Sequence, residues 1–257
     1  ASGVTLEKEW QYGGQRAVVQ KLFADYMKWG GFPELLLFRN KRNWLNSLYD
    51  KILLGDIIQR DKVKNENALR LTMKRLAENV KQPISYNRIA NVIRTTGTSI
   101  AVSSVSDYVR YAVDACMIFS WENYASKFVE KETVKKHYFV DNGLLSIFLL
   151  DGNTALLENL CAIHLHKKYG DKLYFYNKNI EVDFLIVDEG YAVQVSYSIY
   201  GDGKQETFDR ETKALVQLDK YLSLNRMIIV TYDEEGVVTL DNGKQIEVIP
   251  VWKWMLE

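Results

Sequence analysis

The chain has 257 residues, of which 47% are hydrophobic and 26% charged, a balance typical of a globular protein rather than a disordered one. Its 33 basic and 33 acidic side chains cancel, which excludes a global positive field that would draw the whole chain onto nucleic acid. No apolar run approaches the roughly 18 residues of a membrane span and no signal peptide is recognisable, so we expect a cytoplasmic protein that does not enter membranes.

The first part of the chain has the apolar spacing of helices. Residues 16–29 carry apolar side chains three and four positions apart, as on one helix face. The segment Gly30-Gly31-Phe32-Pro33 interrupts this pattern, because paired glycines and a proline are typical of a loop. Helical spacing resumes over residues 43–60 and again over residues 67–80. We therefore expect a helical segment over residues 1–66.

Three helices are predicted in the next part of the chain, residues 67–150, of which residues 67–80 form the first. Ser85 is a suitable N-cap for the second, because its hydroxyl can accept a hydrogen bond from the first turn. A turn at residues 95–98 separates it from the third helix, residues 102–116, for which Ser103 or Ser104 is the expected cap.

Two short strands complete this part. Residues 117–119 and 137–140 have strand-like apolar runs, and the segment between them is a charged loop. The order helix, helix, turn, helix, hairpin is that of a winged helix-turn-helix. Residues 67–150 are therefore predicted to adopt this fold, with the charged loop as its wing.

The last part, residues 151–257, has an α/β pattern. Helices are predicted over residues 155–169 and 206–222, and the predicted strands are residues 173–176, 181–187, 191–197, 226–232, 237–240 and 245–249. The whole chain is thus expected to be an α+β protein with a mixed sheet in its last part.

The hairpin of residues 181–197 is the most informative stretch. Glu181 and Asp183 are two residues apart on one strand, so their side chains share a face of the sheet. Gln194 and Ser196 share a face of the facing strand. Many metal-dependent nucleases bind Mg²⁺ with oxygen ligands that are brought together in this way.

Glu158, Asp183, Gln194 and Ser196 resemble the pattern of the PD-(D/E)XK nuclease superfamily. The resemblance implies a helix acid at Glu158, a metal-binding carboxylate at Asp183, a second acid at position 194 and a lysine at position 196. Gln194 is neutral and Ser196 has no positive charge, so the sequence departs from the superfamily at two positions. A lysine supplied from elsewhere, with Lys168 and Lys178 as candidates, would replace the missing one.

Three interpretations of this centre stay open. Glu158, Asp183 and Glu181 bind Mg²⁺ and cut DNA, or the centre is degenerate and serves binding or structure, or the acids simply lie at a solvated strand end.

The winged part has a mixed charge, which leaves its partner open. Candidate DNA contacts are Arg88, Arg94, Ser103, Ser104, Arg110 and Lys127. Asp107 and Asp114 make the last helix net acidic, however, whereas a helix in the major groove usually brings basic side chains. DNA binding and docking on another protein, or on a second copy of this chain, are both compatible with this pattern.

Several simpler sites are excluded or given structural roles. Cys116 and Cys161 lie in apolar runs and are predicted to be buried thiols. His164 and His166 point to different faces of a helix at their spacing, so they do not share a metal. No phosphate-binding loop of the P-loop type is present, so this chain by itself is not expected to bind ATP or any other cofactor except Mg²⁺ at an active centre.

Eight short segments along the chain carry a wider resemblance. They are residues 29–34, 48–60, 84–91, 103–109, 138–144, 157–160, 181–184 and 249–254. Together they resemble prokaryotic AAA+-like ATPases whose C-terminal half is the domain of unknown function 4143. In that family a P-loop ATPase domain precedes these segments, so the resemblance implies that this chain is the C-terminal portion of a longer, ATP-binding protein.

Overall fold

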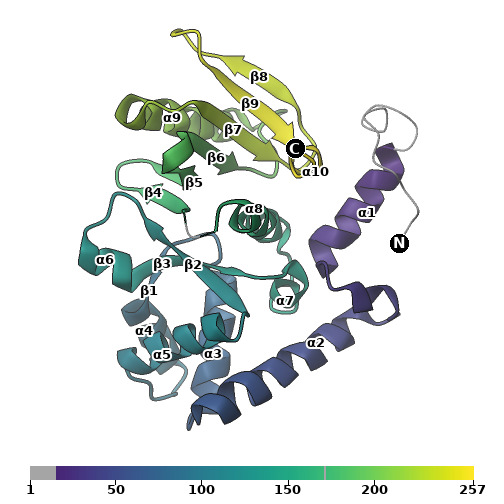
Figure 1. Ribbon diagram of the computed structural model, residues 1–257, viewed down its shortest axis with the longest axis vertical. Helices are drawn as coiled ribbons and strands as arrows, with labels where there is room; N and C mark the ends of the chain where they lie inside the picture. Colours follow the sequence, from purple (N-terminus) through teal and green to yellow (C-terminus); the bar gives the residue numbers. More distant parts are fainter. Residues whose placement is uncertain (1–15, 171) are drawn as a thin grey trace.

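The structure is a computed structural model that describes residues 16–170 and 172–257, and its strands form one sheet (Figure 1). The strands are β1 (Ile84–Ser85), β2 (Ile118–Asn123), β3 (Val134–Phe139), β4 (Tyr174–Asn177), β5 (Glu181–Ile186), β6 (Tyr191–Val195), β7 (Arg226–Thr231), β8 (Gly236–Thr239) and β9 (Gln245–Pro250). Within the sheet they lie in the order β1-β3-β2-β4-β5-β6-β7-β9-β8. The predicted α+β class with a mixed sheet is confirmed.

The helices are α1 (Arg16–Trp29), α2 (Lys41–Lys51), α3 (Glu66–Glu78), α4 (Tyr86–Thr95), α5 (Val102–Asp114), α6 (Phe128–Thr133), α7 (Asn142–Ser146), α8 (Asn153–Tyr169), α9 (Gln205–Leu222) and α10 (Val251–Trp254). A π-helix over Ile52–Gln59 continues α2. Helix α1 has the predicted bounds, and the first 15 residues of the predicted helical segment lie outside the described residues. No helix within residues 16–170 and 172–257 is long and apolar enough to cross a bilayer.

The hairpin β2–β3 is longer than the sequence predicts. Its strands pair antiparallel from Ile118 opposite Phe139 to Glu122 opposite Lys135. Residues 120–123 and 134–136 of the predicted charged loop therefore belong to strands, and residues 124–133 form the tip of the hairpin, which includes α6. The predicted loop is too long because its charged side chains indicate exposure, and the structure contradicts this for part of it. Lys136 in β3 is instead fully buried.

Strand β2 also pairs in parallel with β4, at Glu122 opposite Tyr174 and Asn123 opposite Phe175. The sheet therefore runs without a break across position 150, where the sequence suggests a boundary between two parts. Asn123 reinforces this junction, because its side chain donates to the carbonyl oxygen of Asn177 and accepts from the amide of the same residue.

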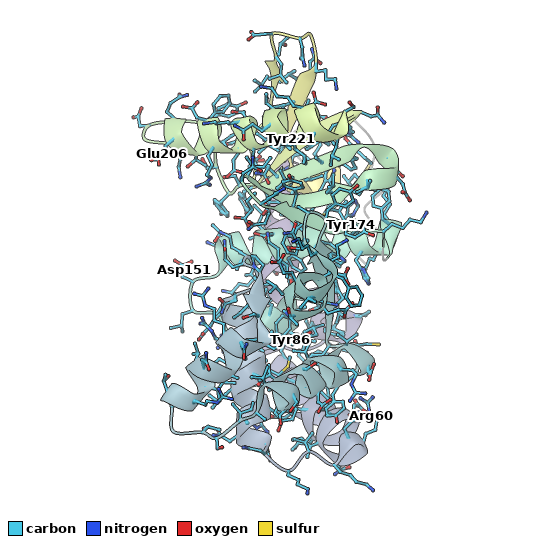
Figure 2. The ribbon with its side chains drawn as sticks, turned by 90° about the vertical axis from the view of Figure 1, so that its left-hand side faces the viewer. Arg60, Tyr86, Asp151, Tyr174, Glu206 and Tyr221 are labelled. Carbon is cyan, nitrogen blue, oxygen red and sulfur yellow. The ribbon has the colours of Figure 1, made fainter. Side chains whose placement is uncertain are left out.

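Two helices cover opposite faces of the sheet. Phe184 and Val193 face the core that contains α8, whereas Leu185 and Ala192 face the core that contains α9. This alternation follows from the two-residue period of strands. Figure 2 shows α9, marked by Glu206 and Tyr221, in the upper half of the elongated molecule and Arg60 near its lower end.

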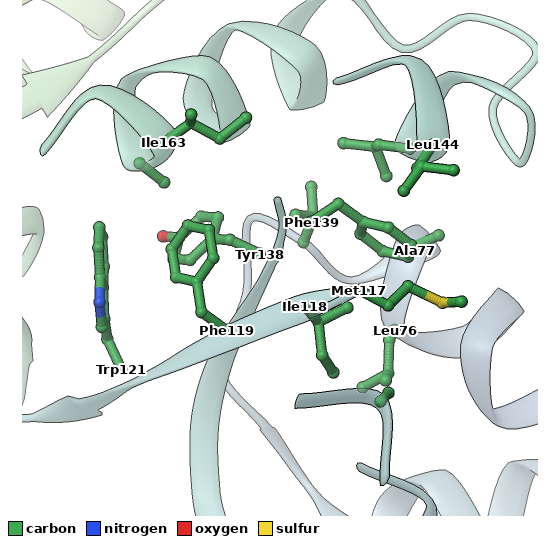
Figure 3. Packing of buried hydrophobic residues seen from close by; sticks show 14 of the residues in the cluster. Leu76, Ala77, Met117, Ile118, Phe119, Trp121, Tyr138, Phe139, Leu144 and Ile163 are labelled. Carbon is green, nitrogen blue, oxygen red and sulfur yellow. The ribbon is translucent and has the colours of Figure 1, made fainter. Parts of the chain in front are cut away.

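The core on the α8 side is rich in aromatic rings. Figure 3 shows Phe119, Trp121 and Tyr138 beside one another, close to Ile163 of α8. The ring of His166 stacks on Phe119, with centroids 4.3 Å apart. His164 instead lies against Trp254. The two histidines thus contact different neighbours, as their spacing on the helix predicts.

Local predictions at the ends of the helices had mixed outcomes. Ser85 caps α4, since its hydroxyl accepts a hydrogen bond from the amide of Arg88. The caps proposed for α5 are wrong, because that helix already begins at Val102, after an extended Ala101, so both serines lie inside it. Cys116 is exposed rather than buried, since the chain leaves α5 there through a left-handed turn with φ 51°.

A buried pair of asparagines ties α8 to its neighbours. The side chain of Asn159 accepts from the amide of Phe139 (2.8 Å) and donates to its carbonyl oxygen (3.0 Å) and to Asn142 (2.9 Å). Asn142 in turn donates to the carbonyl oxygens of Met27 in α1 and Leu156 in α8. Because each of these groups is buried, the network fixes α1, α7, α8 and β3 relative to one another.

Replacing Asn159 by alanine should therefore destabilise the protein by about 2–4 kcal/mol, since the backbone groups of Phe139 and the Asn142 amide oxygen lose their partners. Urea unfolding measures the change. Thr154→Ala, at an exposed position of the same helix, is the control and should have little effect. Equal stability of the two variants would contradict the assigned role of the network.

Candidate functional site

The predicted hairpin of acids is present as β5 and β6, which pair antiparallel with Phe184 opposite Val193. On the other side of β5 the register shifts, because Tyr174 and Tyr176 of β4 face Leu185 and Val182. Strand β5 thus has one residue more than β4 across this step, which is a β-bulge. The bulge lets Asp183 and its neighbour Phe184 both face the α8 side of the sheet.

A buried lysine lies among the acids. The ammonium nitrogen of Lys136 is 3.0 Å from Asp183 Oδ1, 3.3 Å from Glu158 Oε1 and 3.4 Å from Glu181 Oε1. The structure therefore brings the three predicted carboxylates together, from α8 and β5. The lysine at their centre comes from β3, and it is neither Lys168 nor Lys178.

The sequence does not single out Lys136. It lies in a run of charged residues, 22 positions before Glu158 and 47 before Asp183. The sequence does contain one indication that Lys136 is buried. Tyr138 follows it two positions later on the same strand, so the two side chains share a face, and the hydroxyl of Tyr138 also contacts Glu158.

The side chain of Gln194 is hydrogen-bonded to the backbone of β5. Its amide oxygen accepts from the amide of Asp183 (2.8 Å), and its nitrogen donates to the carbonyl oxygen of Glu181 (3.0 Å) and to Glu211 Oε2 (2.8 Å). A second hydrogen bond joins β5 and β6, because Asp183 Oδ2 accepts from the backbone amide of Val195. Ser196 donates its hydroxyl to the carbonyl oxygen of Ser198. Gln194 thus joins β5, β6 and α9, and its oxygen is directed at the backbone.

Burial and charge determine the protonation of this cluster. Burial raises the pKa of Glu158 to about 8, opposed by the attraction of Lys136 and assisted by the repulsion of Asp183. Burial alone would lower the pKa of Lys136, but Glu158 and the other nearby acids raise it well above its usual value. Near neutral pH the lysine is therefore charged and Glu158 mostly holds its proton. The hydroxyl of Tyr138 donates to Glu158 Oε1 (3.1 Å).

The three acids of the cluster line a pocket of about 530 Å³, called here the acidic pocket. Its floor and walls include Glu158, Glu181, Asp183, Gln194 and Glu211, and its basic lining residues are Lys81, Arg210 and Lys213. Arg210 pairs with Glu211 at 2.6 Å. Burial and the charge of Asp183 raise the pKa of Glu211. The pocket thus has an acidic interior with basic side chains beside it.

The donor set does not fit a divalent metal. The three carboxylates already surround an ammonium group, and Gln194 directs its oxygen elsewhere. Across residues 16–170 and 172–257, no group of three or more histidine, cysteine, aspartate or glutamate side chains is arranged to hold a metal ion.

The six candidate DNA contacts differ in what their side chains do. Arg94 donates twice to the carbonyl oxygen of Ile100, at 2.9 and 2.7 Å, and so holds the turn before α5. Arg110 pairs with Asp107 on its own helix. Ser104 is half-buried in α5, and the remaining candidates are exposed: Arg88 in α4, Ser103 in α5 and Lys127 just before α6.

Comparison with known proteins places the chain in a family. Residues 20–155 match the family described as Domain of unknown function (DUF8612). The chain belongs to this family. No solved structure matches the chain. The relation to the domain of unknown function 4143 and to AAA+-like ATPases stays a prediction.

Curated relatives of this DUF8612 chain come from an archaeon and a bacterium. It is 30% identical over 256 residues to the uncharacterized protein MJ1544 of Methanocaldococcus jannaschii, covering 94% of this chain and 57% of the relative. It is 29% identical over 252 residues to an uncharacterized protein of Haemophilus influenzae, covering 95% and 60%. The chain therefore spans less than two thirds of the length of these relatives.

The raised pKa of Glu158 has a consequence for stability. Between the usual glutamate value of 4.5 and about 8, the folded protein holds a proton that the unfolded chain releases. Stability therefore falls as the pH rises through this interval, by at most about 1.4 kcal/mol per pH unit. Lys136 stays charged across the interval in both states and adds no slope, because its pKa is raised from 10.5.

Glu158→Gln should remove this slope, since glutamine does not titrate and its oxygen can still accept from Tyr138 and Lys136. The variant should gain stability relative to the unaltered protein as the pH rises from 5 to 8, which is measured by urea unfolding at several pH values. The raised pKa of Glu211 affects the pH dependence of stability equally in both proteins, so it does not affect their difference. Glu206→Gln, at an exposed position of α9, is the control and should show a constant difference. A constant difference for Glu158→Gln as well would contradict the raised pKa.

Proposed function

We propose that this chain is the DNA-binding and nuclease-like region of a longer AAA+-like ATPase, and that its nuclease-like centre does not cut DNA. One observation carries the catalytic part of the proposal. Gln194 stands at the position of the second metal-binding acid, and its amide oxygen is hydrogen-bonded to the amide of Asp183. A neutral side chain bound to the backbone is a poor ligand for a hard cation.

The order of elements supports the PD-(D/E)XK-like fold over residues 151–257. Helix α8 is followed by the antiparallel strands β4, β5 and β6, then by α9 and by β7 parallel to β6. Acids from α8 and β5 meet at one point, as the resemblance implies for that superfamily. The lysine beside these acids is Lys136, which comes from outside residues 151–257.

The pairing of strands supports a winged helix-turn-helix over residues 67–150. Helix α3, strand β1, helices α4 and α5 and the hairpin β2–β3 follow one another, and β1 pairs antiparallel with β3. Helix α6 lies between the two strands of the hairpin, at the position of a wing. The exposed Arg88, Ser103 and Lys127 would contact DNA, whereas Arg94 and Arg110 are used within the protein.

The longer relatives are consistent with a second domain in the full protein, since this chain spans 57% and 60% of their lengths. ATP would bind there and not to the residues described here. A cytoplasmic location is part of the same proposal.

Two other functions have an observation in their favour. Glu158, Glu181 and Asp183 converge in an open pocket, which would suit an Mg²⁺-dependent endonuclease if these acids became metal ligands. On α6, the side chains of Phe128 and Val129 are 78% and 70% exposed, which would suit docking on a protein partner or a second copy of the chain. The following experiments separate these alternatives from the main proposal.

Incubation with supercoiled plasmid and Mg²⁺ or Mn²⁺ should produce no more nicking than the Asp183→Ala variant, measured on agarose gels. Asp183 is the acid whose loss would abolish metal-dependent cleavage, so equal background from the two proteins is the expected result. Cleavage by the unaltered protein that disappears in Asp183→Ala would establish the endonuclease instead.

DNA binding should weaken as salt rises, because contacts to phosphates release counterions. Lys127→Ala and Arg88→Ala should each weaken binding to duplex DNA several-fold and reduce the slope of log affinity against log salt by about 1. Fluorescence anisotropy measures both quantities. Lys220→Ala, an exposed lysine on α9, is the matched control and should change neither. Absence of binding to duplex, single-stranded and branched DNA, together with a recovered protein partner, would favour the docking function.

A further inference from the structure

We propose that the ammonium group of Lys136 takes the place of a divalent metal ion in the acidic pocket, so that the protein's own side chain excludes metal and its removal would create a metal site. The inference rests on the proposed nuclease-like function and adds to it the reason why the centre does not bind a metal ion.

The ammonium group is surrounded by the carboxyl oxygens of three acids. Its N–H groups donate to Glu158 Oε1 at 3.3 Å and to Asp183 Oδ1 at 3.0 Å, and it forms an ion pair with Glu181 Oε1 at 3.4 Å. These acids come from α8 and β5, on two sides of the lysine. The arrangement is that of a small cation surrounded by oxygen ligands, with the cation carried by the chain itself.

The lysine is fixed in this position. Its side chain is fully buried, and its ammonium nitrogen lies 5.7 Å from the centre of the Phe175 ring. Lys136 belongs to β3, where it pairs with Trp121 of the neighbouring strand. Because the side chain is enclosed by the core and its backbone lies between β1 and β2, moving the ammonium group away from the acids requires repacking of the surrounding side chains.

The distances suit an ammonium group and not a metal ion. Metal–oxygen bonds to Mg²⁺ or Ca²⁺ are about 2.0–2.6 Å long, whereas the acids stand at 3.0 to 3.4 Å from the lysine nitrogen. A metal ion shared by the same three acids would lie where the nitrogen now lies. Competition for one position therefore explains why three convergent acids do not form a metal site.

Truncation of the lysine leaves both charge and space. In Lys136→Ala the carboxylates of Glu181 and Asp183 lose their buried counter-charge, and four side-chain atoms disappear from the centre. Solvent reaches the position through the acidic pocket, since the Glu181 side chain is 38% exposed. A divalent cation with its remaining water ligands is the chemical species that would restore the charge balance there.

The experiment compares Mn²⁺ binding by the unaltered chain, Lys136→Ala and the double variant Lys136→Ala/Asp183→Asn, using calorimetry and thermal unfolding. The unaltered protein should show neither binding nor a shift in unfolding temperature in millimolar Mn²⁺. Lys136→Ala should bind one equivalent and gain several degrees, and the double variant should lose about tenfold or more of that affinity. Lys135→Ala, the neighbour that pairs with Glu122, is the matched control and should behave as the unaltered protein.

Binding of one Mn²⁺ by the unaltered protein that Asp183→Asn abolishes would overturn the inference, whatever the variants do. So would a folded Lys136→Ala that binds no Mn²⁺. If Lys136→Ala is unfolded alone, Mn²⁺ should restore its folding, and failure to do so counts against the inference. The DNA-binding and cleavage assays are independent of these results, so loss of the proposed function and loss of this inference are distinguishable.

Discussion

The structure depends on the neutralisation of one buried positive charge. A lysine ammonium group without counter-charge would be very costly inside a protein, so the acids around Lys136 must be held close to it. Glu158 is supplied by α8 and Asp183 by β5, while the lysine stands on β3. This requirement fixes three elements from distant parts of the chain relative to one another. It also explains why a strand with consecutive charged residues lies in the middle of a core.

The same centre determines what the hairpin of acids can do. The bulge in β5 directs Asp183 toward the lysine, and Gln194 closes the other side by bonding the backbone of β5 and Glu211. Glu158, Asp183 and Gln194, which a metal-dependent nuclease would keep free as ligands, thus have hydrogen-bond partners within the protein. The acids are placed as the proposed nuclease-like fold implies, but their hydrogen bonds are those of a structural centre.

The DUF8612 match covers residues 20–155, and the sheet continues beyond them. Strand β3 belongs both to the hairpin proposed as a wing and to the acidic pocket, through Lys136. The junction of β2 with β4 and the asparagine network around Asn159 join the same regions. The two regions of the chain are therefore one body around a shared core, and a ligand on either region would contact a framework that includes the other.

The sequence by itself determined the elements whose signals are local. The apolar period of residues 16–29 gave α1 its bounds, Ser85 was identified as a cap, and the meeting of Glu158, Glu181 and Asp183 followed from strand alternation and a resemblance. Only the tertiary structure revealed Lys136, because its partners are 22 and 47 residues away and its charge suggested exposure. The hydrogen bonds of Gln194 were likewise decided by residues that lie apart in the sequence, Glu181 and Asp183 in β5 and Glu211 in α9. A periodic pattern reports which face of an element is buried, but the partner of a buried charge is set by long-range packing, which no local pattern contains.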